Sequence, residues 1–202
     1  MLGLPKTTEM NKQLSKNAIY AKFQMNTAAK NRIDRDISRI YIVNEISASK
    51  VNLQEGAKVK AFFVVSVILK RKDFDEKNII TLSKLIPQNM VMVMEYENKA
   101  KLAAYRGKLM QTEWLPKDKL SIELKGLDLD AVWENIIVQI GGLTIEQGRT
   151  LDEQISIDEQ RSKLQKEIDR LEQLARAEKQ PKKKFELVQQ VKRLQREKNN
   201  VN

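Results

Sequence analysis

The stretch "AKVKAFFVVSVILKRK", residues 57–72, decides the fold class of this chain. Its middle, residues 61–69, is the longest apolar run in the sequence, and it is apolar on both faces of an extended strand. A strand of this kind is covered on both sides, as in the interior of a sheet. The pattern therefore predicts a central strand, and the charged residues that follow it mark the point where the chain returns to the surface.

Two elements are predicted before this strand. The stretch "KTTEMNKQLSKNAIYAKF", residues 6–23, has apolar residues at spacings of three and four, which predicts an amphipathic helix with Thr7 or Thr8 as its N-cap. The stretch "ISRIYIVNEIS", residues 37–47, alternates and is rich in β-branched residues, which predicts a strand. In regular alternation Ile40, Ile42 and Asn44 share one face of that strand.

The elements after the central strand complete an α+β domain. Residues 75–89 have a helical apolar stripe that ends at Pro87, and three short strands follow in residues 90–115, with "ENKA" and Gly107 at their turns. Residues 126–142, "GLDLDAVWENIIVQIGG", predict a closing helix with Asp128 or Asp130 as its cap. The expected architecture is a mixed or antiparallel sheet with helices on a face.

A C-terminal antiparallel helical hairpin with coiled-coil spacing is predicted after this domain. Apolar residues recur at alternating spacings of three and four on both sides of Pro181, and a short break joins neighbouring helices. We expect a globular domain at residues 1–145 and a basic hairpin at residues 146–202. The apolar seam is expected to dock a partner; it consists of Leu164, Ile168, Leu171, Leu187, Val191 and Leu194.

The hairpin also concentrates positive charge. Residues 161–198 hold 13 Lys and Arg against 6 Asp and Glu, within a chain of net charge +10. The tip, "KQPKKK", has two interpretations: a solvated turn in which Pro181 starts the second helix, or a contact with nucleic acid or an acidic partner. The candidate contact residues are Lys182, Lys183, Lys184, Lys192, Arg193 and Arg196.

Composition excludes several kinds of chemistry. The chain has no His and no Cys, so it lacks histidine bases, cysteine nucleophiles and Cys/His zinc sites. No Gly-rich phosphate loop, signal peptide or membrane-length apolar segment is present in the sequence. We therefore expect a cytoplasmic, non-enzymatic binding protein that uses no cofactor and no metal and does not contact a membrane.

A metal-dependent nuclease is the alternative. Glu97 and Lys99 form a Glu-x-Lys pair and Asp73 follows the central strand, so carboxylates and a lysine are available to hold magnesium and assist hydrolysis. "ENKA" fits a hairpin turn better than the strand such a site needs, which favours the turn. Likewise, residues 70–72 are interpreted as a surface cluster rather than a phosphate site, and Trp114 and Trp133 as core residues rather than base-stacking ones.

Several phrases, in order, resemble a bacterial and archaeal domain-of-unknown-function family. They are "MLGLPKTTE", "ISRIYIVNEIS", "LSKLIPQNMVMVMEYENKAKLAAYRGKL", "TEWL", "GLDLDAVWENIIVQIGG" and "EKQPKKKFEL". Genes of that family lie beside DNA methyltransferases resembling those of type III restriction enzymes and beside superfamily 2 helicases, in restriction or phage-defence clusters. The resemblance and the apolar seam together lead us to expect an accessory subunit that bridges methyltransferase or helicase subunits, and the basic charge of the hairpin adds the expectation of a non-specific contact with DNA. The resemblance implies no catalytic residues.

Overall fold

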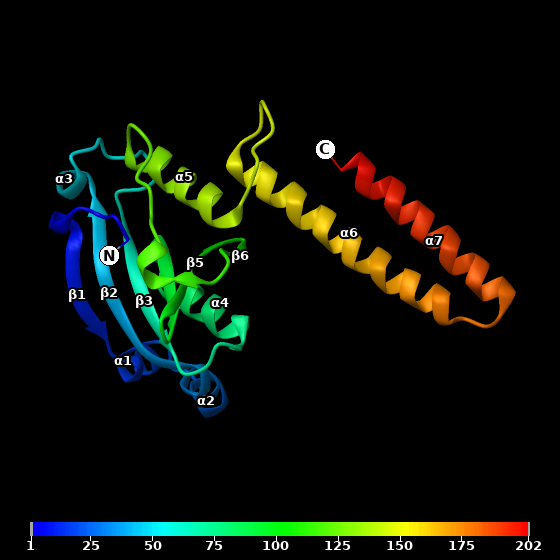
Figure 1. Cartoon of the computed structure of the whole chain (residues 1–202), viewed down its shortest axis with the longest axis horizontal. Helices are drawn as coiled ribbons and strands as arrows, with labels where there is room; N and C mark the ends of the chain where they lie inside the picture. The colour runs from blue at the N-terminus through cyan, green and yellow to red at the C-terminus, as the bar shows by residue number, and fades with distance from the viewer. Residues whose placement is uncertain (1, 202) are drawn as a thin grey trace. The chain divides into compact units, whose positions relative to one another are not determined.

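The computed structural model describes residues 2–201, which form two compact units with their boundary between Thr144 and Ile145 (Figure 1). The first unit contains the sheet and five α-helices, and the second contains the helical hairpin. This boundary lies one residue before the one expected from the sequence.

The first unit is built on one seven-stranded sheet, which confirms the predicted α+β class. Six strands lie in sequence order, and all neighbours are antiparallel except β3 and β4. The seventh, β7, pairs with β5. The strands are β1 (Glu9–Leu14), β2 (Ile37–Ser47), β3 (Ala61–Leu69), β4 (Met90–Tyr96), β5 (Lys99–Arg106), β6 (Lys108–Gln111) and β7 (Leu115–Pro116).

The central position of β3 is confirmed, since it pairs with β2 on one side and β4 on the other. Parallel strands need a crossover connection, and helix α4 (Glu76–Leu85) supplies it between β3 and β4. Asp75 caps α4 by accepting a hydrogen bond from the Lys77 N–H. Phe62 and Val64 are fully buried on one face of β3, and Val65 and Val67 are buried on the other.

Helices cover both faces of the sheet. On one face, Ile33 of α2 (Thr27–Asp36) and Ile79 of α4 share a core with Val65 and Met92, to which α1 (Lys16–Lys22) also contributes. On the other face, Phe62 packs against Trp133 of α5 (Leu129–Gly141), with ring centroids 5.3 Å apart. The core position predicted for Trp133 is confirmed, because that side chain is 6% exposed.

Strand β2 does not keep the regular alternation expected from its sequence. The register with β3 shifts between Ile42 and Asn44, which pair with Val65 and the adjacent Val64. Val43 is the extra residue of this β-bulge, and a bulge changes which face the following side chains occupy. Asn44 therefore faces away from the α1/α2/α4 layer, so the prediction that it shares a face with Ile42 is wrong.

The predicted helix at residues 6–23 is also wrong in its first half. A 3-10 turn, η1 (Lys6–Thr8), leads into edge strand β1, whose residues pair with β2. Ser15, rather than Thr7 or Thr8, caps helix α1, accepting a hydrogen bond from the Ala18 N–H. Strand pairing satisfies the backbone of residues 9–14, which outweighs their helical spacing. Helix α2, capped by Asn26, was not predicted from the sequence.

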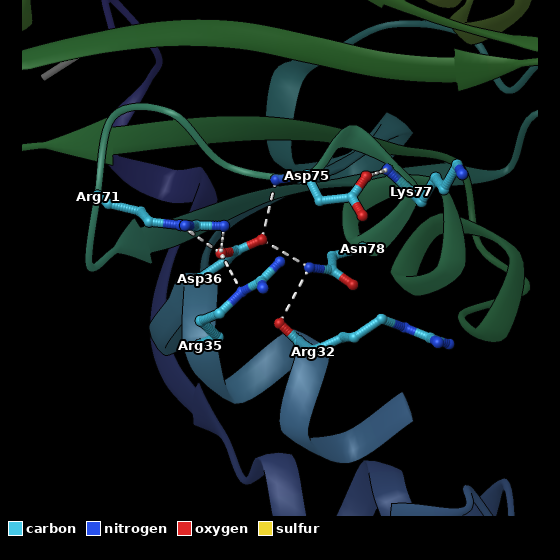
Figure 2. A network of polar contacts seen from close by, with 7 residues as sticks. All are labelled: Arg32, Arg35, Asp36, Arg71, Asp75, Lys77 and Asn78. Carbon is cyan, nitrogen blue, oxygen red and sulfur yellow. Dashed lines mark hydrogen bonds and ion pairs between the residues drawn. The ribbon is translucent and has the colours of Figure 1, made fainter. Parts of the chain in front are cut away.

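A buried polar network joins α2 to the loop after β3 (Figure 2). Asp36 has no exposed side-chain surface. Its carboxylate accepts hydrogen bonds from the Arg71 guanidinium at 2.6 Å, the Asp75 N–H at 2.9 Å and the Asn78 amide at 2.7 Å. Burial alone would raise the pKa of Asp36, but these three donors outweigh it and hold that pKa below its ordinary value.

Helix α5 closes the first unit as predicted. Asp128 caps it through the Ala131 N–H, and Gly142 ends it in the left-handed conformation. Asp130 instead reaches the loop before β3, where it accepts hydrogen bonds from the Lys58 and Val59 N–H groups. That loop also follows a short helix, α3 (Ala48–Val51).

The second unit is the predicted antiparallel hairpin. Helices α6 (Leu151–Ala177) and α7 (Pro181–Asn200) lie side by side in Figure 1, joined by residues 178–180. Thr150 and Glu153 form a capping box at the start of α6. Pro181 occupies the first turn of α7, where its missing N–H has no helical partner to lose.

Candidate functional site

A pocket with polar side chains on its floor lies on the face of the sheet that α1, α2 and α4 do not cover. Its volume is about 250 Å³. Asn44, Ser66 and Glu95, from strands β2, β3 and β4, belong to its floor. The walls include Leu2 and the segment that begins with the 3-10 turn η2 (Lys117–Lys119). These two wall segments are joined by a backbone hydrogen bond from Ile122 N–H to the Leu2 carbonyl, 3.0 Å long. We call this pocket the sheet pocket.

A chain of hydrogen bonds crosses the floor of the sheet pocket. The Ser66 hydroxyl donates to one carboxylate oxygen of Glu95, and the Lys117 ammonium donates to the other at 2.7 Å. Ser66 is 5% exposed, and the side chains of Glu95 and Lys117 are 15% and 31% exposed. A half-enclosed ion pair of this kind holds all three side chains in place, while the open side of the pocket leaves them accessible to a small molecule.

Asn44 is the second polar group of the floor. Its amide nitrogen donates to the Thr8 hydroxyl oxygen at 2.8 Å, and the Thr8 hydroxyl donates to the Pro5 carbonyl at 2.6 Å. Because the Thr8 proton is used on Pro5, Thr8 can only accept from Asn44, which fixes the orientation of the amide. Among the described residues, nothing donates to the Asn44 side-chain oxygen. Asn44 is 7% exposed.

The sheet pocket was not predicted from the sequence. One signal for it is Ser66, the single polar residue in the nine-residue apolar run of β3, because a hydroxyl inside a buried strand needs a partner. A second signal is Glu95, which ends the apolar run of β4. Their proximity depends on the parallel register of β3 and β4, in which Ser66 pairs with Val93 and Ile68 with Glu95.

The seam expected to dock a partner lies inside the hairpin. Ile168, Leu171 and Val191 are buried against one another, and Leu187 and Leu194 pack on them, while Leu164 is partly buried. Two polar residues at seam spacing also bond across the hairpin: Arg161 donates to the Val201 carbonyl at 2.9 Å, and Lys198 to the Gln165 side chain at 2.6 Å. The seam thus closes the hairpin, and its use by a partner stays a prediction.

The six basic contact candidates are all exposed on α7. No ion pair involves Lys182, Lys183, Lys184, Lys192, Arg193 or Arg196 within the described part of the chain. Three apolar side chains close to them are exposed as well, and the sequence analysis did not single them out. Phe185 is 64% exposed, Leu174 46% and Val188 37%. The sequence could have indicated their exposure, because their spacing relative to the seam residues puts them on the flanks of the two helices rather than between the helices.

The structure places the three nuclease candidates in a turn, at the start of a strand and in a loop. Glu97 lies in the turn between β4 and β5 with φ of 51°, Lys99 begins β5, and Asp73 is exposed in the loop after β3. The Glu97 carboxylate accepts a hydrogen bond from Tyr96 and thereby raises the pKa of that phenol. Across residues 2–201, no three acidic side chains lie together as metal ligands would.

The remaining sequence candidates also have defined positions. Of the basic cluster at residues 70–72, Lys70 and Lys72 are exposed, whereas Arg71 is held by Asp36. Trp114 is partly buried against the core shared with α4. The Lys101 ammonium stacks over the rings of Trp114 and Phe74, 5.1 and 5.0 Å from their centroids. Burial lowers the pKa of Lys101, although nearby Glu76 and Glu113 act in the opposite direction.

Comparison with known proteins identifies the family. Residues 2–197, almost the whole chain, match the family described as "Domain of unknown function (DUF4391)". The chain belongs to that family. No curated protein and no solved structure matches it. Within residues 2–201, none of the helices combines the length and the apolar character needed to cross a membrane.

Proposed function

We propose that this protein is a non-enzymatic, cytoplasmic accessory subunit of a restriction or phage-defence complex. In this proposal the hairpin binds a protein partner and the sheet unit provides a second surface, so that the chain bridges subunits. The partner is a DNA methyltransferase or a helicase, which carries out the chemistry. The resemblance described above supports the identity of the partner.

The exposed flank of α7 is the observation that carries the proposal. Phe185 leaves 64% of its surface in solvent, and Val188 lies one helical turn further along. Aromatic side chains are frequent binding hot spots when a partner buries them. Lys184 is next to Phe185 in the sequence, Lys182 precedes Phe185 by about one helical turn, and Lys192 follows Val188 by one turn. The complementary surface is therefore an apolar pocket with acidic residues at its rim, since opposite charges speed and orient association.

Purification of the tagged protein from its host, followed by identification of the bound chains, tests this proposal. A methyltransferase or helicase subunit should co-purify with the wild type and be lost from the Phe185→Asp/Val188→Asp variant. Leu127→Asp is the matched control, because Leu127 is 88% exposed but belongs to the sheet unit. Absence of both partners from the wild type, or retention by the double variant, would contradict the proposal.

Contact with DNA is the second part of the proposal and has a separate test. Changing Lys182, Lys183 and Lys184 to Gln should lower the slope of log affinity against log salt concentration by up to about 3, because each phosphate contact releases about one counterion. A control with Lys6, Lys12 and Lys119 changed to Gln removes the same charge elsewhere on the surface. Superimposable titrations of the wild type and the tip variant would show that the tip is a turn only.

A further inference from the structure

The sheet pocket has the opposite charge to the protein that contains it. Glu9 and Glu95 line it together with one cation, Lys117, whereas the chain as a whole carries a net charge of +10. The lining therefore has a formal charge of −1. A negative pocket on a positive protein attracts cations locally even though the surface as a whole does not.

Hydrogen-bond acceptors also outnumber donors in the sheet pocket. The Ser66 proton is used on Glu95, so this hydroxyl offers only its lone pairs. Asn44 is 7% exposed as a residue; its amide is fixed by the bond to Thr8, and no described residue donates to its side-chain oxygen. The Glu95 carboxylate retains lone pairs after accepting from Ser66 and Lys117, since a carboxylate has about four acceptor sites. A ligand that matches these groups must bring N–H donors.

Except for Asn11, the remaining lining is apolar, and the space is small. Leu2, Val93 and Leu120 contribute hydrocarbon surface, and each is buried. A volume of about 250 Å³ lies below the usual range of about 300–1,000 Å³ for pockets that hold drug-sized ligands. The occupant is therefore a small molecule with a short apolar body.

We propose that the sheet pocket binds a small organic cation, a primary ammonium group on a short aliphatic body. The ammonium lies against Glu95 and the Asn44 oxygen, and the aliphatic part lies against Leu2, Val93 and Leu120. Lys117 then acts as the resident cation that competes with the ligand for Glu95. Substitution of Glu95 should therefore weaken ligand binding, whereas substitution of Lys117 should strengthen it.

Titrations with three probes of nearly equal size test the proposal by NMR of the ¹⁵N-labelled full chain. n-Butylammonium should bind at millimolar concentrations and shift the Asn44 side-chain amide and the backbone amides of Ser66 and Glu95. Butyramide and butyrate should leave these signals unchanged. Glu95→Gln should weaken n-butylammonium binding by about tenfold, as expected for the loss of a charged hydrogen-bond partner.

The Lys117→Gln variant gives the sharper test, since Lys117 is exposed enough for its loss to be tolerated. Removing the competing cation should tighten n-butylammonium binding, by about threefold or more for a partly exposed charge. Substitution of Lys119, an exposed lysine of the same turn, by Gln should have no effect. Weaker binding in Lys117→Gln, binding of butyrate at these signals, or no shift with n-butylammonium would each overturn the proposal.

Discussion

At the scale of single residues, Asp36 has the largest expected effect on stability. A carboxylate without exposed surface must be compensated, and Asp36 is compensated by Arg71, Asp75 and Asn78, which come from the loop after β3 and the start of α4. This single side chain therefore joins the end of α2 to the crossover helix. The sequence reveals only an acidic residue between a helix and a strand, so its partners could not be predicted.

We predict that Asp36→Ala lowers the free energy of unfolding by about 3 kcal/mol, because it leaves buried donors without an acceptor. Asp73→Ala is the control: Asp73 is an exposed acid of the adjacent loop, where substitutions usually change stability by less than about 0.5 kcal/mol. Urea unfolding at neutral pH measures both. Equal effects of the two substitutions would show that the network does not stabilise the fold.

The lowered pKa of Asp36 predicts a specific dependence on pH. A carboxyl group with a depressed pKa in the folded state stabilises the fold above its unfolded pKa, about 3.9, and this contribution is lost as the pH falls through the folded pKa. The stability difference between wild type and Asp36→Asn should therefore be largest above about pH 5 and shrink towards pH 3. Urea titrations across this range measure it; a constant difference would contradict the prediction.

At the scale of elements, long apolar patterns were predictive and edge elements were not. Strand β3, helix α4 and helix α5 could be predicted from their sequences, because their buried faces require apolar residues at characteristic positions. Met10 and Leu14 have helical spacing but both lie in β1, since an exposed edge of β2 was available for pairing. The faces of β2 could not be predicted either, because a one-residue bulge leaves no mark in the alternation of side chains.

The contact between helix α5 and the loop before β3 can be tested by a substitution at Gly56. A Cβ atom on Gly56 would lie 2.2 Å from an Asp130 carboxylate oxygen, so Gly56→Ala should displace the carboxylate from the Lys58 and Val59 N–H groups. We expect a loss of about 2 kcal/mol, within the usual range for overpacking. In the Gly56→Ala/Asp130→Ala double variant the clash with the carboxylate is absent and the contact with the Asp130 backbone nitrogen, 2.7 Å from the Cβ atom, remains, so the two effects should be non-additive in urea unfolding. Additive effects would exclude this contact as the cause.

At the scale of the whole molecule, the division into two units was anticipated, whereas the sheet pocket was not. The change from strand and helix patterns to a coiled-coil spacing is visible along the chain near residue 145. The pocket assembles residues from five neighbouring strands, β1 to β5, the segment before β1 and the segment after β7. Such a site depends on strand order and register, which a single sequence does not specify.

We predict that a fragment ending at residue 144 folds without the hairpin, because its apolar patterns close on one sheet. It should melt in one cooperative transition when followed by circular dichroism, as expected for a single domain of this size. In the full chain, Leu171→Ala should lower the stability of the hairpin and leave that transition in place. A fragment without a cooperative transition would show that the two units depend on each other.

The hydrogen bond between Leu2 and Ile122 has a consequence for synthesis on the ribosome. At about 5–20 residues per second, the segment that receives Leu2 is made on the order of ten seconds after Leu2 itself. During that interval β1, β2 and β3 have been translated and the floor of the sheet pocket can begin to assemble, but its wall cannot close. The Leu2 carbonyl of the nascent chain therefore stays without this partner until residue 122 has emerged, and the pocket is among the last parts of the sheet unit to reach its final form.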